Sequence, residues 1–313
     1  MYIKYCISLL IVGIIMYFFA KSFKKNWTDI SKANLSFSIP YILYAMVFIL
    51  THYLLCTLTW RMLINGDKKG KTLNMRECVG INFMSALTKY LPGKIWSYAF
   101  QFYILTQKEF ELAKVVFDNI VLLTISVTTV ALIAIVYLVT VFLTVSTFVK
   151  IAILIGVIVV YLVCLTFLSN ILDFFLKLAS KISSKVPASY KISRKMIFQT
   201  QAGMLLANIA LATAAVFLSY GISTANAFTQ AVEIAVCSII SSMVGLMAIF
   251  VPGGLGVQES TLSFLLRSSF PIAAVLIFPV AFRLAILVGD AIRGTIAVFC
   301  MKTELKHFKK ANK

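Results

Sequence analysis

Charged residues are scarce in this 313-residue sequence, at 13% of the chain, whereas an average soluble domain has about 25%. Hydrophobic residues make up 61% of the chain, well above the about 45–50% of a soluble domain. A soluble protein of this size could not bury so much apolar surface away from water. The composition therefore excludes a soluble globular fold and predicts a protein embedded in a lipid bilayer.

Metal-binding and redox-active side chains are also few. The only histidines are His52 and His307, and the six cysteines are scattered, with no C-x-x-C pair. A histidine-based metal site is not expected from two histidines. The cysteines are predicted to be small core residues. We expect neither a metal nor a cofactor.

Long apolar runs indicate the spans. A helix needs about 20 residues to cross a hydrocarbon core about 30 Å thick. The first run lacks a small-x-small cleavage pattern, which favours a retained span over a signal peptide. The predicted fold is all-α, one transmembrane domain over residues 1–313 with about seven spanning helices. The predicted spans are residues 3–20, 39–63, 112–143, 149–170, 196–220, 226–250 and 271–300.

Two further apolar segments are interrupted. Residues 78–106 are broken at Pro92-Gly93, and residues 244–268 are broken at Pro252-Gly253-Gly254. Proline removes a backbone donor and glycine permits the turn that follows, so each break is expected to stop a helix. We expect broken or re-entrant helical hairpins at both places.

The formal net charge of +18 reflects lysines and arginines that lie mostly between the apolar runs. No basic stripe is interleaved with aromatic residues, so nucleic-acid binding is not expected. The positive-inside bias favours cytoplasmic termini, with residues 302–313 as a short basic tail, although four lysines of the first loop oppose this orientation. The two broken elements would then enter from opposite faces, as in transporters with inverted repeats. Two unrelated kinked helices are the alternative.

Two sequence strings surround the breaks. They are Lys89-Tyr-Leu-Pro-Gly-Lys-Ile-Trp-Ser97 and Val251-Pro-Gly-Gly-Leu-Gly-Val-Gln-Glu259. They resemble the P-G-x-[IV]-[WG]-S and P-G-G-[LI]-G-x-x-E patterns of the lysylphosphatidylglycerol synthase transmembrane family, also called flippase-like proteins. The resemblance extends over most of the chain, and the second motif is the more specific one.

The resemblance implies a multi-pass protein of a bacterial cytoplasmic membrane that moves amphipathic lipids between leaflets. The lipid would be an anionic or aminoacylated phospholipid or a lipid-linked glycan. Synthase members carry an additional soluble aminoacyl-transfer domain, and because this sequence stops at Lys313, that activity is not expected. Arg283 matches a position where members often have arginine. Family members tend to have an acidic residue followed by arginine at the position of Asp118-Asn119. Because Asn119 is uncharged, the resemblance does not predict an ion pair there.

The residue types at the breaks suggest a substrate-binding site without reference to the family. Small glycines leave backbone donors open to a headgroup phosphate at the start of the next helix, where the carboxylate of Glu259 would contact a cationic headgroup or cap the helix. Lys89 and Lys94 would hold a lipid phosphate or extend to the membrane interface. The predicted substrate-binding residues are Lys89, Pro92, Gly93, Lys94, Trp96, Pro252, Gly253, Gly254, Gly256, Glu259 and Arg283.

Charges inside apolar runs are costly, at about 2.5–3.5 kcal/mol each on insertion scales, and are rarely kept without a partner or water. Asp290 and Arg293 are three residues apart and can pair on one helix face. Arg283 needs a partner elsewhere, with Glu259 and Glu233 as candidates. A structural pairing and a polar cavity for a headgroup are both compatible with these charges. The predicted intramembrane polar residues are Asp118, Asn119, Glu233, Asp290 and Arg293.

Three functions follow from these features. The first is a lipid flippase-like transporter without a nucleotide site, in which movement is downhill or coupled to an ion or proton gradient. The second is a non-transporting membrane partner that docks a lipid-modifying enzyme or glycosyltransferase through basic loops. The third, an intramembrane enzyme that uses Asp118, Glu233 or Glu259 as acid or base, is the least favoured, because no second catalytic group lies at a recognisable spacing. We therefore predict no catalytic residues.

Overall fold

The computed structural model describes residues 21, 24, 28, 36–66, 71–91, 95–141, 143–182, 192–223, 228–249 and 251–311. The predicted span at 3–20 lies outside these residues, as does the interruption at Pro92, Gly93 and Lys94.

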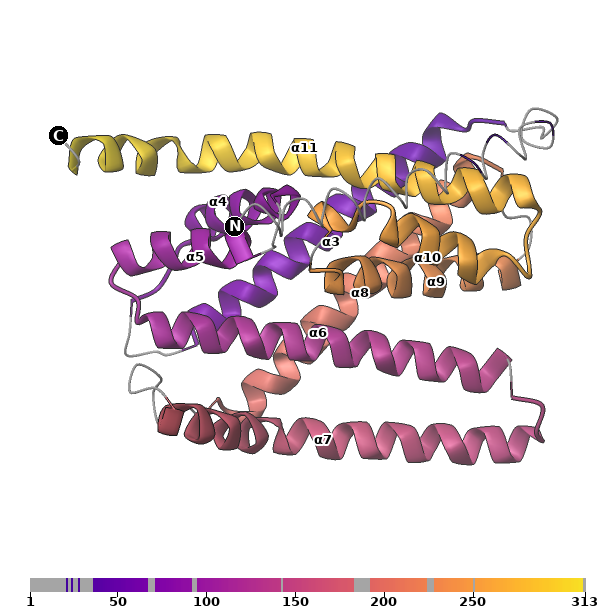
Figure 1. Ribbon diagram of the computed structural model, residues 1–313, viewed down its shortest axis with the longest axis horizontal. Helices are drawn as coiled ribbons and strands as arrows, with labels where there is room; N and C mark the ends of the chain where they lie inside the picture. The colour runs from indigo at the N-terminus through magenta and orange to yellow at the C-terminus, as the bar shows by residue number, and fades with distance from the viewer. Residues whose placement is uncertain are drawn as a thin grey trace. The chain divides into compact units, whose positions relative to one another are not determined.

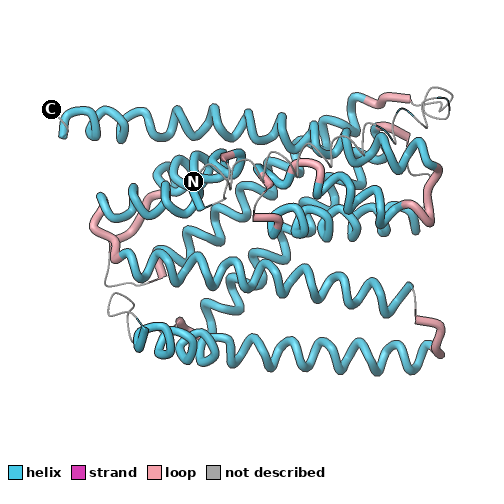
Figure 2. The backbone as a smooth tube through the Cα atoms, viewed as in Figure 1, coloured by secondary structure: helices cyan, strands magenta, loops and turns pink. Residues whose placement is uncertain are grey.

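The described chain is built from helices joined by loops, and Figure 2 shows no strand in it. The long helices labelled in Figure 1 are α3, α6, α7, α8, α9 and α11, and the shorter ones are α4, α5 and α10. Their bounds are α3 Ile39–Ile64, α4 Met75–Leu87, α5 Ile95–Gln107, α6 Leu112–Val141, α7 Thr147–Ile182, α8 Arg194–Gly221, α9 Phe228–Met247, α10 Val257–Leu266 and α11 Ile272–Ala311. Two 3-10 turns complete the order, η1 Thr88–Tyr90 and η2 Pro252–Gly254.

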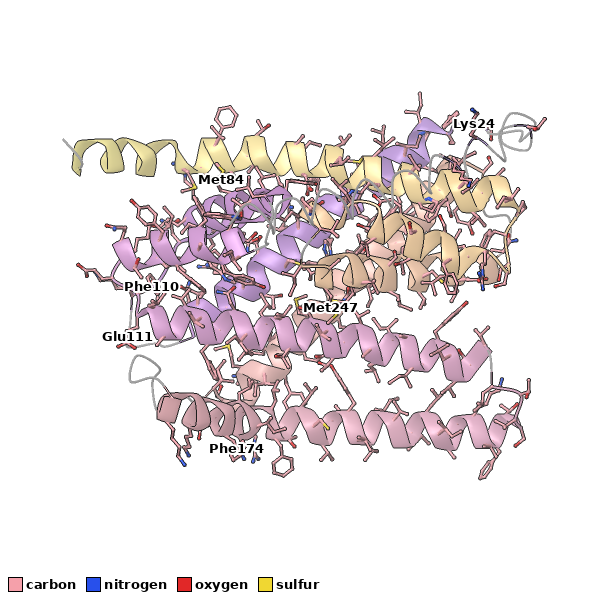
Figure 3. The ribbon with its side chains drawn as sticks, in the orientation of Figure 1. Lys24, Met84, Phe110, Glu111, Phe174 and Met247 are labelled. Carbon is pink, nitrogen blue, oxygen red and sulfur yellow. The ribbon has the colours of Figure 1, made fainter. Side chains whose placement is uncertain are left out.

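Six of these helices are long and apolar enough to cross a membrane, namely α3, α6, α7, α8, α9 and α11. They confirm the six predicted spans from 39–63 onward and the all-α multi-pass fold. Apolar side chains cover the outside of these helices, as at Phe174 on α7 and Met247 at the end of α9 (Figure 3). Such apolar surfaces are stable against lipid hydrocarbon, because they present no polar group that would need a hydrogen bond there.

Two helices continue beyond the predicted spans. Helix α7 continues to Ile182 and α11 continues to Ala311, beyond the predicted ends of these spans at residues 170 and 300. Hydropathy detects only the part of a helix that suits lipid. Once a helix is nucleated, each further residue adds a hydrogen bond, and lysine and leucine are good helix formers.

Two compact units make up the chain. Unit 1 comprises the described residues of Met1–Leu54, Val79–Phe100 and Ala207–Lys313, and unit 2 comprises those of Leu55–Cys78 and Gln101–Leu206. In unit 1, α10 packs against α9 and α11 (Figure 1), around a core that includes Ile49, Leu262 and Phe282. In unit 2, α6 packs against α7, and its core includes Phe117 and Ile125.

The second predicted interruption is confirmed in detail. Helix α9 ends at Met247, η2 follows, and α10 begins at Val257. The three glycines of this connection, Gly253, Gly254 and Gly256, have φ values of 58°, 67° and 79°, which side chains with a Cβ rarely adopt. The first segment is also divided, because α4 and η1 end before Leu91 and α5 begins at Ile95. Opposed entry of the two elements and an inverted repeat stay predictions.

A capping box begins α4 in unit 2. Asn74 accepts a hydrogen bond from the Glu77 backbone N–H at 2.9 Å, and the Glu77 carboxylate accepts one from the Asn74 N–H at 2.8 Å. Lys108 donates to the other carboxylate oxygen at 2.6 Å. Burial raises the pKa of Glu77, but the bonds from Lys108 and Asn74 outweigh burial and hold this pKa below its ordinary value.

This cap predicts a pH-dependent effect of Glu77→Gln. Because the Glu77 pKa is lower in the folded state, the unfolded state binds the proton first as the pH falls, and the stabilisation present at neutral pH is lost in acid. The variant should melt at a lower temperature than the wild type at pH 7, and the difference should shrink toward about pH 4. Thermal unfolding of the detergent-solubilised protein measures it. Glu111→Gln, at an exposed carboxylate labelled in Figure 3, is the control, and a difference that stays constant with pH would contradict the prediction.

Candidate functional site

A cluster of charged and polar side chains lies inside unit 1, where η1, η2, α10 and α11 come together with α3. Its two carboxylates are Glu259 on α10 and Asp290 on α11. Its cations are Lys89 on η1 and Arg283 and Arg293 on α11. The two carboxylates and both arginines are buried, with Asp290 only 2% exposed. We call these five residues the charge cluster.

Asp290 is the centre of the first half of the cluster. Its Oδ1 accepts a hydrogen bond from the Tyr53 hydroxyl at 2.9 Å and lies 2.7 Å from Arg293 Nη2. Its Oδ2 lies 2.7 Å from Lys89 Nζ and accepts a bond from the Tyr90 hydroxyl. The Arg293 guanidinium also lies over the Tyr53 ring, 4.2 Å from its centroid, in a cation–π contact. The pair Asp290–Arg293 predicted from the three-residue spacing is therefore present.

Arg283 organises the second half. Its Nη1 donates to Gln258 Oε1 at 2.9 Å, and its Nη2 donates to the Gly253 carbonyl at 2.8 Å. Its Nε lies 3.4 Å from Glu259 Oε1. Of the two candidate partners named from the sequence, Glu259 is the one that the structure brings to Arg283. Glu233 is half-buried on α9 and makes no ion pair with the described residues.

The two halves join where η1 contacts η2. A Cβ at Gly253 would lie 2.8 Å from the Tyr90 ring and 3.1 Å from Arg283 Nη2. Only glycine therefore lets η2 approach both groups. The two interrupted segments thus place Lys89 and Gly253, more than 150 residues apart in sequence, at one site.

Glu259 both caps a helix and carries a charge into the cluster. Its Oε2 accepts the Gly256 backbone N–H at 2.7 Å, which is one half of a capping box. Its other oxygen faces Arg283. The cap that was one of its two predicted roles is present, and the carboxylate belongs to an ion pair as well. Lys89, whose alternative was to extend to the interface, is paired with Asp290.

The other predicted substrate-binding residues differ in position. Pro252 begins η2, and Gly254 is buried against α9, where its missing Cβ would lie 2.5 Å from the Gly245 carbonyl oxygen. Trp96 is 43% exposed in the first turn of α5. Pro92, Gly93 and Lys94 lie outside the described residues.

Asp118 and Asn119 lie in the buried interior of unit 2. Asp118 pairs with Lys114, one turn earlier on α6, at 2.7 Å. Asn119 donates to the Val115 carbonyl at 2.8 Å. The position where the family tends to have an acidic-arginine pair thus holds an acidic-lysine pair within a single helix. The sequence contained this signal, because residues four apart lie on one helix face.

Sequence analysis missed three members of the site, Tyr53, Tyr90 and Gln258. Tyr90 and Gln258 are inside the two motifs, next to Lys89 and Glu259. Tyr53 lies in the apolar run that forms α3. A buried tyrosine hydroxyl usually has a hydrogen-bond partner. The presence of Tyr53 in an apolar span could therefore have indicated a polar group nearby.

The cluster can hold an anionic group. Arginine keeps its charge in proteins and offers five N–H donors in a fixed plane, and lysine offers three. Lys89 is its most accessible cation, with 25% of its side chain exposed. A negatively charged group could therefore reach Lys89 while the arginines stay in place.

Comparison with known proteins gives one family. The model of the family described as Lysylphosphatidylglycerol synthase TM region matches residues 5–294, which include both motifs and the whole charge cluster. This match confirms the resemblance drawn from the motifs. The search of curated proteins found no match.

Proposed function

Because the chain belongs to the lysylphosphatidylglycerol synthase transmembrane-region family, whose members are membrane proteins of lipid metabolism or transport, we propose that it moves an amphipathic lipid between the leaflets of the membrane. The headgroup passes along the charge cluster of unit 1 while the acyl tails stay in lipid. The sequence carries no nucleotide-binding motif, so the movement is downhill or is driven by an ion or proton gradient.

The contact of η1 with η2 at the charge cluster is the observation that supports this proposal most strongly. Arg283, Asp290 and Arg293 lie within the apolar span Ile272–Met301 of α11. Charges in such a span are costly and usually mark a substrate or ion path. Interrupted helices that meet beside such charges are the arrangement in which many transporters bind their substrates.

The test removes one ion pair from the cluster. The variant is Arg283→Ala combined with Glu259→Ala, which takes away one cation and one carboxylate and so keeps the net charge. Movement of a fluorescent phospholipid is measured in proteoliposomes, with dithionite bleaching of the outer leaflet. A lost charged hydrogen bond costs about 1.5–3 kcal/mol, so the rate should fall at least about tenfold.

A matched control removes an ion pair outside the cluster. Lys71→Ala combined with Glu109→Ala breaks a pair whose side chains are 57% and 74% exposed, and it should keep the wild-type rate because exposed pairs contribute little. Elution of each variant as a single species after purification shows that it is folded. If the wild type moves lipid no faster than empty vesicles, or the cluster variant matches the wild type, the transport proposal is wrong.

A further inference from the structure

The carboxylates of the charge cluster are already occupied. A carboxylate has about four sites for hydrogen-bond donors, and Asp290 receives four groups, from Tyr53, Arg293, Lys89 and Tyr90. Glu259 is engaged at both oxygens, as described above. A cationic headgroup entering this site would find no free carboxylate at Asp290 and would have to displace Arg283 at Glu259.

The donors, in contrast, are not all used. The buried Nε of Arg293 donates no hydrogen bond to the described residues, and the Nε of Arg283 has only its 3.4 Å ion-pair contact with Glu259 among them. Lys89 has three N–H groups, and among the described residues its only ion pair is with Asp290. The site thus has hydrogen-bond donors that the described residues do not use, and the most accessible of these donors are on Lys89.

The formal charges agree with this count of donors and acceptors. Three cations, Lys89, Arg283 and Arg293, face two carboxylates, Glu259 and Asp290, which leaves one positive charge in excess among these residues. An excess charge in a buried site is unfavourable unless a counter-charge neutralises it. One phosphate diester supplies that counter-charge.

From this we infer that the charge cluster selects lipids with a net negative headgroup, in which a phosphate is the only charged group. The inference rests on the proposed function and narrows its substrate. The phosphate contacts Lys89, the most accessible cation of the cluster, and its negative charge balances the excess positive charge. A zwitterionic headgroup adds an ammonium for which the cluster offers no free carboxylate, and a lysylated headgroup adds two.

The test compares three lipids that share a phosphate and differ in headgroup charge. Fluorescent phosphatidylglycerol, phosphatidylcholine and lysyl-phosphatidylglycerol are placed one at a time in neutral proteoliposomes, and transfer of each is followed by dithionite bleaching. Phosphatidylglycerol should move at least about tenfold faster than the other two, as expected for one unmatched charged contact. Equal rates for the three lipids, or a faster aminoacylated lipid, would overturn the selectivity and leave the transport function standing. Movement of none of them would instead contradict the transport function.

A single substitution tests the origin of the preference. Lys89→Gln removes the excess positive charge and keeps a side chain of similar length that can donate to Asp290. The preference for phosphatidylglycerol over phosphatidylcholine should fall severalfold in this variant. Lys150→Gln, at a lysine of unit 2 that donates to the Thr140 carbonyl, should keep the preference. An unchanged preference in Lys89→Gln would overturn the role given to this lysine.

Inorganic phosphate distinguishes a lipid site from a site for a soluble anion. The melting temperature of the detergent-solubilised protein is measured with phosphatidylglycerol in the micelles or with inorganic phosphate in the buffer. The lipid should raise this temperature in the wild type and less in Lys89→Gln. Stabilisation by inorganic phosphate equal to that by the lipid would overturn the assignment to a lipid headgroup.

Discussion

Asp290→Asn is expected to destabilise the protein more than any other single change in the charge cluster. The carboxylate holds Lys89 and Arg293 together and accepts the hydroxyls of Tyr53 and Tyr90. Its neutral replacement leaves two cations in the interior of unit 1 without a counter-charge, and its amide nitrogen cannot accept a bond. Breaking a buried ion pair in this way costs about 3–5 kcal/mol. Titration of the purified protein with SDS measures the free energy of unfolding.

Asp173→Asn is the matched control for this change. Asp173 is also buried on a long apolar helix, but Lys177, which pairs with it at a distance of 3.0 Å, is 59% exposed. Lys177 can therefore remain hydrated when the carboxylate is lost, and the cost should be about 1 kcal/mol or less. If Asp290→Asn costs no more than Asp173→Asn, the carboxylate does not hold the cluster together as described.

Gly254→Ala is expected to disrupt the interrupted segment between α9 and α10. The added Cβ would lie 2.5 Å from the Gly245 carbonyl oxygen and 2.9 Å from its carbon, at a residue with a φ of 67°. These are backbone atoms of α9, which cannot rotate away as a side chain could. Overpacking and backbone strain each cost about 1–3 kcal/mol, so the variant should lose several kcal/mol in the same SDS titration.

Gly156→Ala provides the comparison for an added methyl group. Gly156 lies in α7, and a Cβ at this position meets no atom within 4 Å. Alanine is the better helix former by about 1 kcal/mol, so this variant should be as stable as the wild type or slightly more stable. A Gly254→Ala variant with wild-type stability would mean that η2 does not pack tightly on α9.

The spans could be predicted from the sequence because lipid imposes a simple rule on it. A helix that crosses the bilayer must be apolar along its length, and the runs at 112–143 and 271–300 therefore marked α6 and α11. The interruption at Pro252 was also predictable, since proline and glycine act locally on the backbone. The pair Asp290–Arg293 followed from helical periodicity alone.

Contacts between distant segments could not be obtained in this way. Asp290 meets Tyr53 and Lys89 across more than 200 residues of sequence, and helix periodicity places residues on a face without saying which helix covers it. For Arg283 the sequence left Glu259 and Glu233 open for the same reason. The choice depended on how α10 packs against α11, which is a property of the assembled unit.

Both halves of the charge cluster have their central residue on the same continuous helix, α11. Arg283 and Asp290 are seven residues apart, which is about two turns, or about 10 Å along the axis. Arg283 is attached to η2, and Asp290 is attached to η1. Sliding or rotation of this helix would therefore disturb both attachments, the one at Gly253 and the one at Lys89, in the same step.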